Sequence, residues 1–307
     1  MRNSDGNLDM GNKMREFFSE RELGKKEPKS EEISVSVYNG IVTIFEKYKI
    51  NFSKSFPIYC DDYDNVVCGF DDYLFYHNLK AMIPNMHTPI RPINSEHELP
   101  DKYAILDFIE FCFLNFYDVE ELGFHSFYGH YHYNFTKSNK QKERFREEIN
   151  RLFERNGIVF YLDKDGMIKR ILPTGMDYLI SNLKVRTHDD ILNELIGIAL
   201  TKIKEPKRED RIMALEKIWD AFERLKTFYT DDKKESVTEL IKKVAGKTPK
   251  FDVLLEEEFK TLTRIGNEYQ IRHFERDKIQ IESLQQIDYL FYRMLTLINL
   301  CLSTINL

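Results

Sequence analysis

The sequence lacks the features that mark secreted, membrane-spanning and nucleotide-binding proteins. No apolar run reaches the roughly 18 residues that a membrane helix needs, and the polar start Met1–Lys13 has no signal-peptide stretch. Neither a G-x-x-x-x-G-K-[ST] loop nor a G-x-G-x-x-G or G-x-S-x-G motif occurs, so ATP-dependent, dinucleotide and α/β-hydrolase enzymes are poorly supported. The 4 cysteines form no C-x-x-C pair, and we expect them to be reduced structural thiols. These absences predict a cytoplasmic protein without a membrane partner.

The densest group of metal-binding side chains is a short histidine cluster. His125, His130 and His132 lie close together, with Asp118 nearby, and imidazoles suit borderline metals. The segment lacks the i, i+4 spacing of helical ligand pairs and shows no plain fourth ligand. An aromatic-packed structural loop is therefore the favoured interpretation and a site for a metal ion is the alternative; we assign no metal ligand and no cofactor from the sequence.

Charge is distributed unevenly along the 307 residues. The net charge is −6, yet residues 51–123 hold 13 acidic against 4 basic residues, whereas residues 201–250 hold 14 Lys and Arg against 10 acidic residues. A local positive surface attracts polyanions such as RNA. Solvated faces of helices with interleaved charges would have the same composition.

Periodicity predicts two domains of mainly α structure. Residues 1–28 are polar and predict an N-terminal arm with at most one short helix. Residues 29–184 predict a helical N-terminal domain with a small β-hairpin at 158–172, and residues 185–307 predict a helical bundle. The bundle helices are expected at Asp189–Lys204, Arg208–Tyr229, Ser236–Val244, Phe251–Phe274 and Ser283–Ile305.

The predicted hairpin has two possible roles. Asp163-Lys164-Asp165-Gly166 provides turn chemistry between two arms with strand propensity. A winged-helix wing would contact nucleic acid through Lys164, Lys169 and Arg170. A small hairpin that caps the helical core is the alternative.

One segment offers a plausible reaction centre. Between Arg264 and His273 the chain carries two arginines, Asn267 and an imidazole. An imidazole moves protons near neutral pH, a guanidinium holds a phosphate, and an amide orients either group. These groups suit RNA cleavage, although an ordinary helix end with basic residues at its C-terminal dipole has the same composition.

Three stretches of sequence carry a resemblance to a known family. They are Phe17-Phe18-Ser19-Glu20-Arg21-Glu22-Leu23-Gly24, the segment from Phe145-Arg146-Glu147-Glu148 through Asn156-Gly157-Ile158, and Trp219-Asp220-Ala221-Phe222-Glu223-Arg224-Leu225-Lys226-Thr227. Together they resemble the abortive-infection proteins of the AbiJ type, whose C-terminal domain belongs to the HEPN superfamily of helical bundles.

The resemblance implies a metal-independent endoribonuclease of bacterial antiviral defence, usually a homodimer whose two active segments face a shared groove. In the HEPN signature four to six residues lie between an Arg, which is commonly followed by Asn, His or Asp, and a His. Asn267 and His273 match the second and last positions, whereas Gly266 stands in place of the Arg. On a continuous helix Arg264 lies opposite His273, and Arg272 lies about 100° away. Arg272 is therefore the expected substitute cation.

The candidate catalytic residues are thus His273, Arg272 and Asn267, with Glu223 and Arg264 in supporting roles. Glu223 would orient Arg272 or His273 from the facing helix, unless it forms only a surface pair with Lys226. RNA, a second copy of the chain and a regulatory protein are the expected partners. The alternative function is a catalytically inactive bundle that dimerises and binds RNA or protein.

Overall fold

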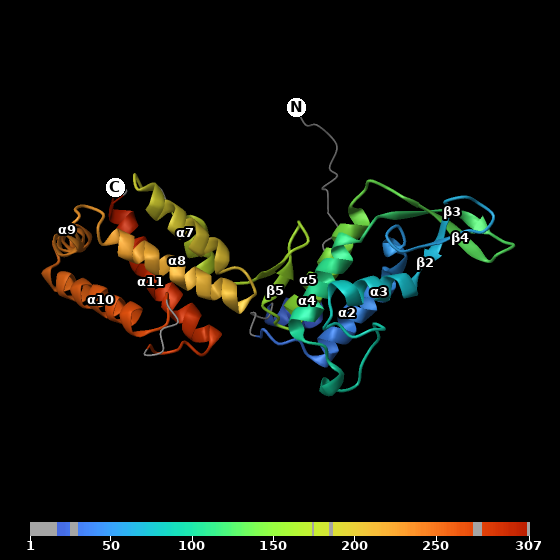
Figure 1. Cartoon of the computed structure of the whole chain (residues 1–307), viewed down its shortest axis with the longest axis horizontal. Helices are drawn as coiled ribbons and strands as arrows, with labels where there is room; N and C mark the ends of the chain where they lie inside the picture. The colour runs from blue at the N-terminus through green and yellow to red at the C-terminus, as the bar shows by residue number, and fades with distance from the viewer. Residues whose placement is uncertain (1–16, 25–29, 174, 184–186, 273–277, 306–307) are drawn as a thin grey trace, which may run out of the picture. The chain divides into compact units, whose positions relative to one another are not determined.

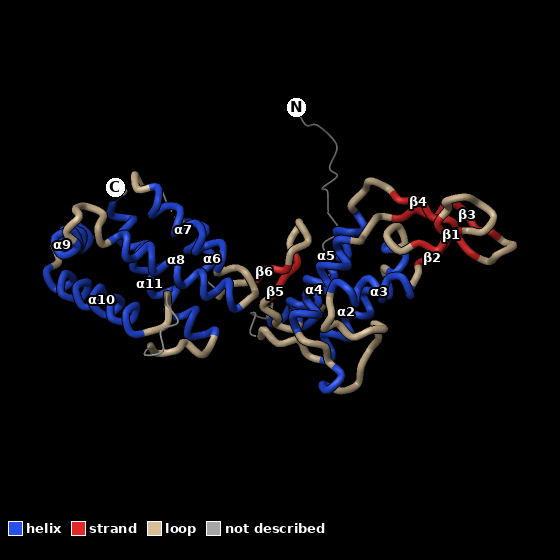
Figure 2. Tube along the Cα trace, viewed as in Figure 1, coloured by secondary structure: helices blue, strands red, loops and turns tan. Residues whose placement is uncertain are grey.

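The computed structural model describes residues 17–24, 30–173, 175–183, 187–272 and 278–305. Contacts divide the chain into two compact units, Met1–Val159 and Phe160–Leu307 (Figure 1; Figure 2). The sequence had placed the boundary at 184/185, so this division lies earlier and assigns the predicted hairpin to the second unit. Both units are mainly helical in the described residues, as predicted.

The first unit is built on helices whose starts are capped by side chains. Asp71 accepts a hydrogen bond from the Leu74 amide at 3.0 Å, and Asp101 caps its helix through two amides. The helices of this unit are α1 (Phe18–Leu23), α2 (Val35–Lys47), α3 (Asp72–Met82), α4 (Lys102–Leu114) and α5 (Lys140–Arg155), with two short 3₁₀ turns, η1 (Lys49–Phe52) and η2 (Glu96–Glu98).

Aromatic rings form the core of the first unit. Helix α4 is buried on most of its circumference. The Phe45 ring stacks on Phe75 with centroids 5.2 Å apart and meets Phe108 edge-on at 5.5 Å. Phe145 brings α5 into the same cluster through Phe52. These contacts join α2, α3, α4 and α5 into one core.

A four-stranded antiparallel sheet lies where the sequence predicted loops. Its strands are β1 (Pro57–Tyr59), β2 (Val67–Phe70), β3 (Val119–His125) and β4 (His130–Phe135), in the order β1-β2-β4-β3 (Figure 2). The expected His- and Tyr-rich loop is therefore wrong: it is the β3–β4 hairpin. Strand β4 alternates polar and aromatic residues, and Gly129 closes the turn with a φ of 68°.

The N-terminal segment expected as an arm contains a docked helix. Glu20 of α1 forms ion pairs with Arg151 and Arg155 of α5, and the Arg155 guanidinium lies 4.1 Å from the centre of the Phe17 ring. These contacts tie the Phe-Ser-Glu-Arg stretch to the helix-and-turn segment that carried part of the resemblance.

The second unit is a helical bundle (Figure 1). Helix α8 packs against α7 and α11, and α9 packs against α10 and α11. Although α11 has 22 residues, neither it nor any other helix in the described ranges is long and apolar enough to cross a membrane. The helices of this unit are α6 (Met176–Asn182), α7 (Asp190–Lys202), α8 (Arg208–Leu225), α9 (Lys233–Ala245), α10 (Pro249–Glu268) and α11 (Leu284–Ile305).

The predicted β-hairpin is present and is fastened to this bundle. Strands β5 (Phe160–Leu162) and β6 (Ile168–Arg170) pair antiparallel. The buried Arg170 guanidinium binds both carboxylate oxygens of Asp288 on α11, at 2.7 and 3.3 Å, and donates to the Ile203 carbonyl. Lys169 pairs with Glu205. The hairpin therefore caps the helical core, and two of the three cations of the alternative wing are engaged within the protein.

Candidate functional site

Helix α10 ends before the predicted catalytic histidine. Its last residue is Glu268, and Tyr269 is extended with φ −97° and ψ 155°. The chain is then held by a bridge between Tyr269 and Ile279, in which the Gln270 amide donates to the Ile279 carbonyl at 2.9 Å. The predicted continuous helix to Phe274 is wrong, so helical angles do not relate residues 266 and 273. His273 lies outside the described residues.

Gly266 lies against the indole of Trp219. A Cβ added at Gly266 would lie 1.7 Å from Trp219 Nε1 and 2.4 Å from its Cε2. Real Cβ atoms do not approach other atoms so closely, so the helices α8 and α10 meet here only because residue 266 has no side chain. Trp219 fills the space that the side chain of the expected arginine would occupy.

Arg272 is positioned by the same part of α8. Its Nε lies 3.1 Å from Asp220 Oδ1, and its guanidinium carbon lies 5.3 Å from the centre of the Trp219 ring. The Asp220 side chain is 16% exposed, whereas that of Arg272 is 47% exposed. Asp220 holds one edge of the Arg272 guanidinium and the Trp219 ring lies against one face of it. The rest of the guanidinium remains open to solvent.

Glu223, the carboxylate expected to orient Arg272, has other partners. It forms ion pairs with Lys226, the residue that follows the end of α8, and with Lys233 at the start of α9, the latter at 3.3 Å. Lys226 also donates to Thr263 Oγ1 of α10 at 3.1 Å. Glu223 therefore links three helices, and Asp220, one turn earlier, pairs with Arg272 instead.

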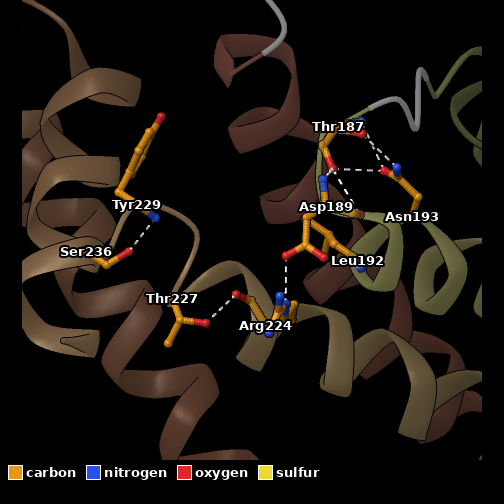
Figure 3. A network of polar contacts seen from close by, with 8 residues as sticks. All are labelled: Thr187, Asp189, Leu192, Asn193, Arg224, Thr227, Tyr229 and Ser236. Atoms are coloured by element: carbon orange, nitrogen blue, oxygen red, sulfur yellow. Dashed lines mark hydrogen bonds and ion pairs between the residues drawn. The ribbon is translucent and has the colours of Figure 1, made fainter. Parts of the chain in front are cut away.

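A further arginine of α8 belongs to a helix cap (Figure 3). Arg224 Nε donates to Asp189 Oδ2 at 2.7 Å, while Asp189 Oδ1 accepts from the Leu192 amide at the start of α7. Burial acts to raise the pKa of Asp189, but these hydrogen bonds outweigh it and hold the pKa below its usual value. Thr187 and Asn193 complete the cap through three mutual hydrogen bonds. Arg224 is thus structural.

The other two predicted residues lie near the end of α10. Asn267 and Arg264 are both exposed on this helix. Arg264 precedes the helix end and Arg272 follows it, so the two cations belong to different local structures. Arg272 is the one that the fold brings to Trp219 and Asp220.

Sequence reasoning missed the roles of Trp219 and Asp220. Trp219 is the only tryptophan in the chain, and Gly266 interrupts an amphipathic helix. A glycine inside a helix often marks a place where another element packs closely. Gly266 was therefore the feature of the sequence that could have indicated this contact. Asp220 lies three residues before Glu223, so sequence alone could not choose between two carboxylates one turn apart.

Comparison with known proteins identifies the first part of the chain. The family model described as AbiJ N-terminal domain 4 matches residues 16–176. This range contains the docked helix α1, the sheet and the β5–β6 hairpin. No curated protein and no solved structure matches the chain.

Proposed function

Because the chain belongs to the AbiJ N-terminal domain 4 family, an abortive-infection family, we propose that it serves bacterial antiviral defence as an endoribonuclease. The family match supports the defence role. The proposed reaction rests on the C-terminal unit, and above all on the placement of Arg272 against Asp220 and Trp219.

The proposed reaction is an internal attack on the RNA backbone. The ribose 2′-hydroxyl forms a bond to the adjacent phosphorus while the bond to the 5′-oxygen breaks, which leaves a 2′,3′-cyclic phosphate and a 5′-hydroxyl. A base must take the 2′ proton, an acid must protonate the leaving oxygen, and a cation must stabilise the negative charge that develops on the non-bridging phosphoryl oxygens. No metal is needed for these steps.

The roles follow from the chemistry of each group. His273 transfers the protons, because an imidazole titrates near neutral pH. Arg272 stabilises the pentacoordinate phosphorus, and Asn267 orients the substrate or one of these side chains. Asp220 acts as a positioning residue, since its ion pair with Arg272 fixes one edge of the guanidinium.

The observation that carries this proposal is a solvent-open guanidinium adjacent in sequence to an imidazole. The Arg272 guanidinium is half-exposed, with Asp220 at one edge and the Trp219 ring against one face, so its remaining N–H groups are open to a phosphate. The basic excess within residues 201–250 supplies attraction for a polyanion to the same unit.

The experiment is cleavage of single-stranded RNA by the purified full chain in EDTA. We expect products that end in 2′,3′-cyclic phosphate, and we expect no cleavage of the same sequence made as DNA, which has no 2′-hydroxyl. Cleavage that proceeds on DNA, or 3′-hydroxyl products, would contradict internal attack.

A homodimer is part of the proposal. The resemblance implies two active segments that face one groove, and a symmetric contact would place two copies of Arg272 along the same RNA. A regulatory protein partner that controls this contact fits a defence role, because uncontrolled RNA cleavage harms the cell.

The glycine at position 266 favours an alternative to the ribonuclease function. If Arg272 does not replace the arginine of the signature, the bundle is an inactive module that dimerises and binds RNA or protein. The RNA-cleavage experiment separates the two functions, since the inactive module binds RNA without cutting it.

A further inference from the structure

The sheet of the first unit gathers a thiol and three imidazoles at one place. His130 and His132 are two residues apart on β4 and so project from the same face. His125 on β3 is the register partner of His130 across the hairpin. Cys60 follows β1 directly, and its amide donates to the Val66 carbonyl at 2.8 Å, which folds the chain back beside the sheet. The fold thus brings Cys60 beside histidines that lie 65 or more positions later in the sequence.

Their separations suit a single metal ion. One ligand atom from each of Cys60, His125, His130 and His132 lies within 4.8 Å of all the others. Cys60 Sγ and His125 Nδ1 are 3.6 Å apart. A sulfur at 2.3 Å and a nitrogen at 2.1 Å from one tetrahedral zinc ion lie about 3.6 Å apart, and two such nitrogens lie about 3.4 Å apart. Pairs at the 4.8 Å limit would need to close by about 1.2–1.4 Å to reach these separations, a shift that side-chain rotation can supply.

Two of the imidazoles have unsatisfied nitrogens. His130 Nε2 and His132 Nε2 are buried and have no hydrogen-bond partner among the residues that the structure describes. Buried polar atoms normally have a partner, because loss of hydration without one is unfavourable. We propose that Cys60, His125, His130 and His132 bind one structural Zn²⁺ ion that joins the end of β1 to the β3–β4 hairpin.

The donor set favours zinc. A soft thiolate together with three imidazoles is a ligand set that suits Zn²⁺, and four protein ligands close a tetrahedral site and leave no position for a substrate. Cys60 binds as the thiolate, so its proton passes to solvent when the ion enters.

The surroundings would orient the ligands. Asp62 Oδ2 lies 3.4 Å from His125 Nε2, on the opposite side of the ring from Nδ1, and Tyr128 donates to the other Asp62 oxygen at 3.0 Å. A carboxylate on the distal nitrogen is a common support for a zinc-bound histidine. Tyr63 packs against the rings of His125 and His132.

A nucleophilic thiol is the competing account of Cys60. Cys60, His125 and Asp62 form a chain of contacts like that of a thiol activated by a base. That account leaves the buried nitrogens of His130 and His132 unsatisfied, and Cys60 is only 6% exposed, so a substrate has little access to its sulfur. The metal site explains all four side chains.

The first test is the metal content of the full chain purified without chelators. We expect one zinc ion per chain, and a loss of most zinc in Cys60→Ser and in His130→Ala. Cys68→Ser, which changes the thiol in the neighbouring strand β2, and His97→Ala, which changes an exposed imidazole, should keep the ion. A wild-type chain that neither contains zinc nor takes it up from a weak zinc buffer would overturn the proposal.

The second test uses the folded wild-type chain alone, so it does not depend on variants that fold. After zinc is exchanged for Co²⁺, we expect the intense visible bands of a tetrahedral ion and a thiolate-to-cobalt charge-transfer band. Alkylation of Cys60 by iodoacetamide should be slow with zinc bound and faster after chelation. Weak octahedral cobalt bands, or alkylation of Cys60 at a rate that zinc does not change, would support the nucleophilic thiol and reject the metal site.

Discussion

Trp219 occupies the space into which a side chain at Gly266 would project, with its Nε1 only 1.7 Å from the position of a Cβ. The glycine at the place of the signature arginine is therefore required by helix packing. An arginine there would have to displace the chain's only tryptophan from between α8 and α10. In the proposed reaction the cation therefore has to come from another residue, and Arg272 lies over the same indole.

We predict that Gly266→Ala destabilises the bundle by at least about 1–3 kcal/mol, the usual cost of overpacking. The matched control is Gly197→Ala in α7, where an added Cβ meets nothing within 4 Å. Alanine should be neutral there or stabilise by up to about 1 kcal/mol. Thermal unfolding of both variants measures the difference, and equal melting temperatures would contradict the close contact with Trp219.

The hairpin anchor gives a second prediction. Arg170→Ala leaves the Asp288 carboxylate without its bidentate partner, and loss of one partner of a buried pair costs about 3–5 kcal/mol. Lys164→Ala, in the exposed hairpin turn, is the control and should change stability little. Denaturant unfolding compares the two. If Arg170→Ala is as stable as Lys164→Ala, the hairpin is not held by this ion pair.

The third prediction concerns which carboxylate, Asp220 or Glu223, orients Arg272. Asp220→Asn weakens the ion pair that orients Arg272, and we expect RNA cleavage to slow on the order of tenfold, equivalent to about 1.4 kcal/mol. Glu223→Gln should have a smaller effect on the rate, because Glu223 pairs with Lys226 and Lys233. Single-turnover cleavage rates of the two variants on the same RNA show which carboxylate orients Arg272. A larger effect at Glu223 would restore the assignment that sequence alone favoured.

Helical periodicity predicted most of the fold, because its signal is local. The helices expected at Asp189–Lys204, Arg208–Tyr229 and Ser283–Ile305 are present as α7, α8 and α11. The end of α10 was not predicted correctly, because no glycine or proline follows Glu268 to mark it. The helix stops at the bridge between Tyr269 and Ile279. That bridge joins residues ten positions apart in the sequence, a contact that local periodicity does not report.

The sheet was missed for a similar reason. Its strands are short, and the alternating histidines and tyrosines from His130 to Tyr133 were read as a loop. Spacing alone could not show that Cys60 joins the imidazoles, because strand pairing brings them together. The local signals that were present were the β-forming aromatic residues and a period of two.

We predict that the chain forms a symmetric dimer through its C-terminal unit. Sedimentation at micromolar concentration, which detects associations of about −8 kcal/mol, should show a dimer. A monomer at that concentration would remove the shared groove from the account, although each copy of Arg272 would keep its contacts.

The most direct test of the central claim is RNA cleavage by purified variants of the full chain, each shown to be folded. His273→Ala and Arg272→Ala should lower the rate by about 10²–10⁴-fold, the usual contribution of a proton-transfer group. Arg264→Ala should keep most activity, because Arg264 lies on α10 before the helix end. If the wild-type chain cuts no RNA, or if cutting survives the loss of His273, the ribonuclease account is wrong and the inactive binding module replaces it.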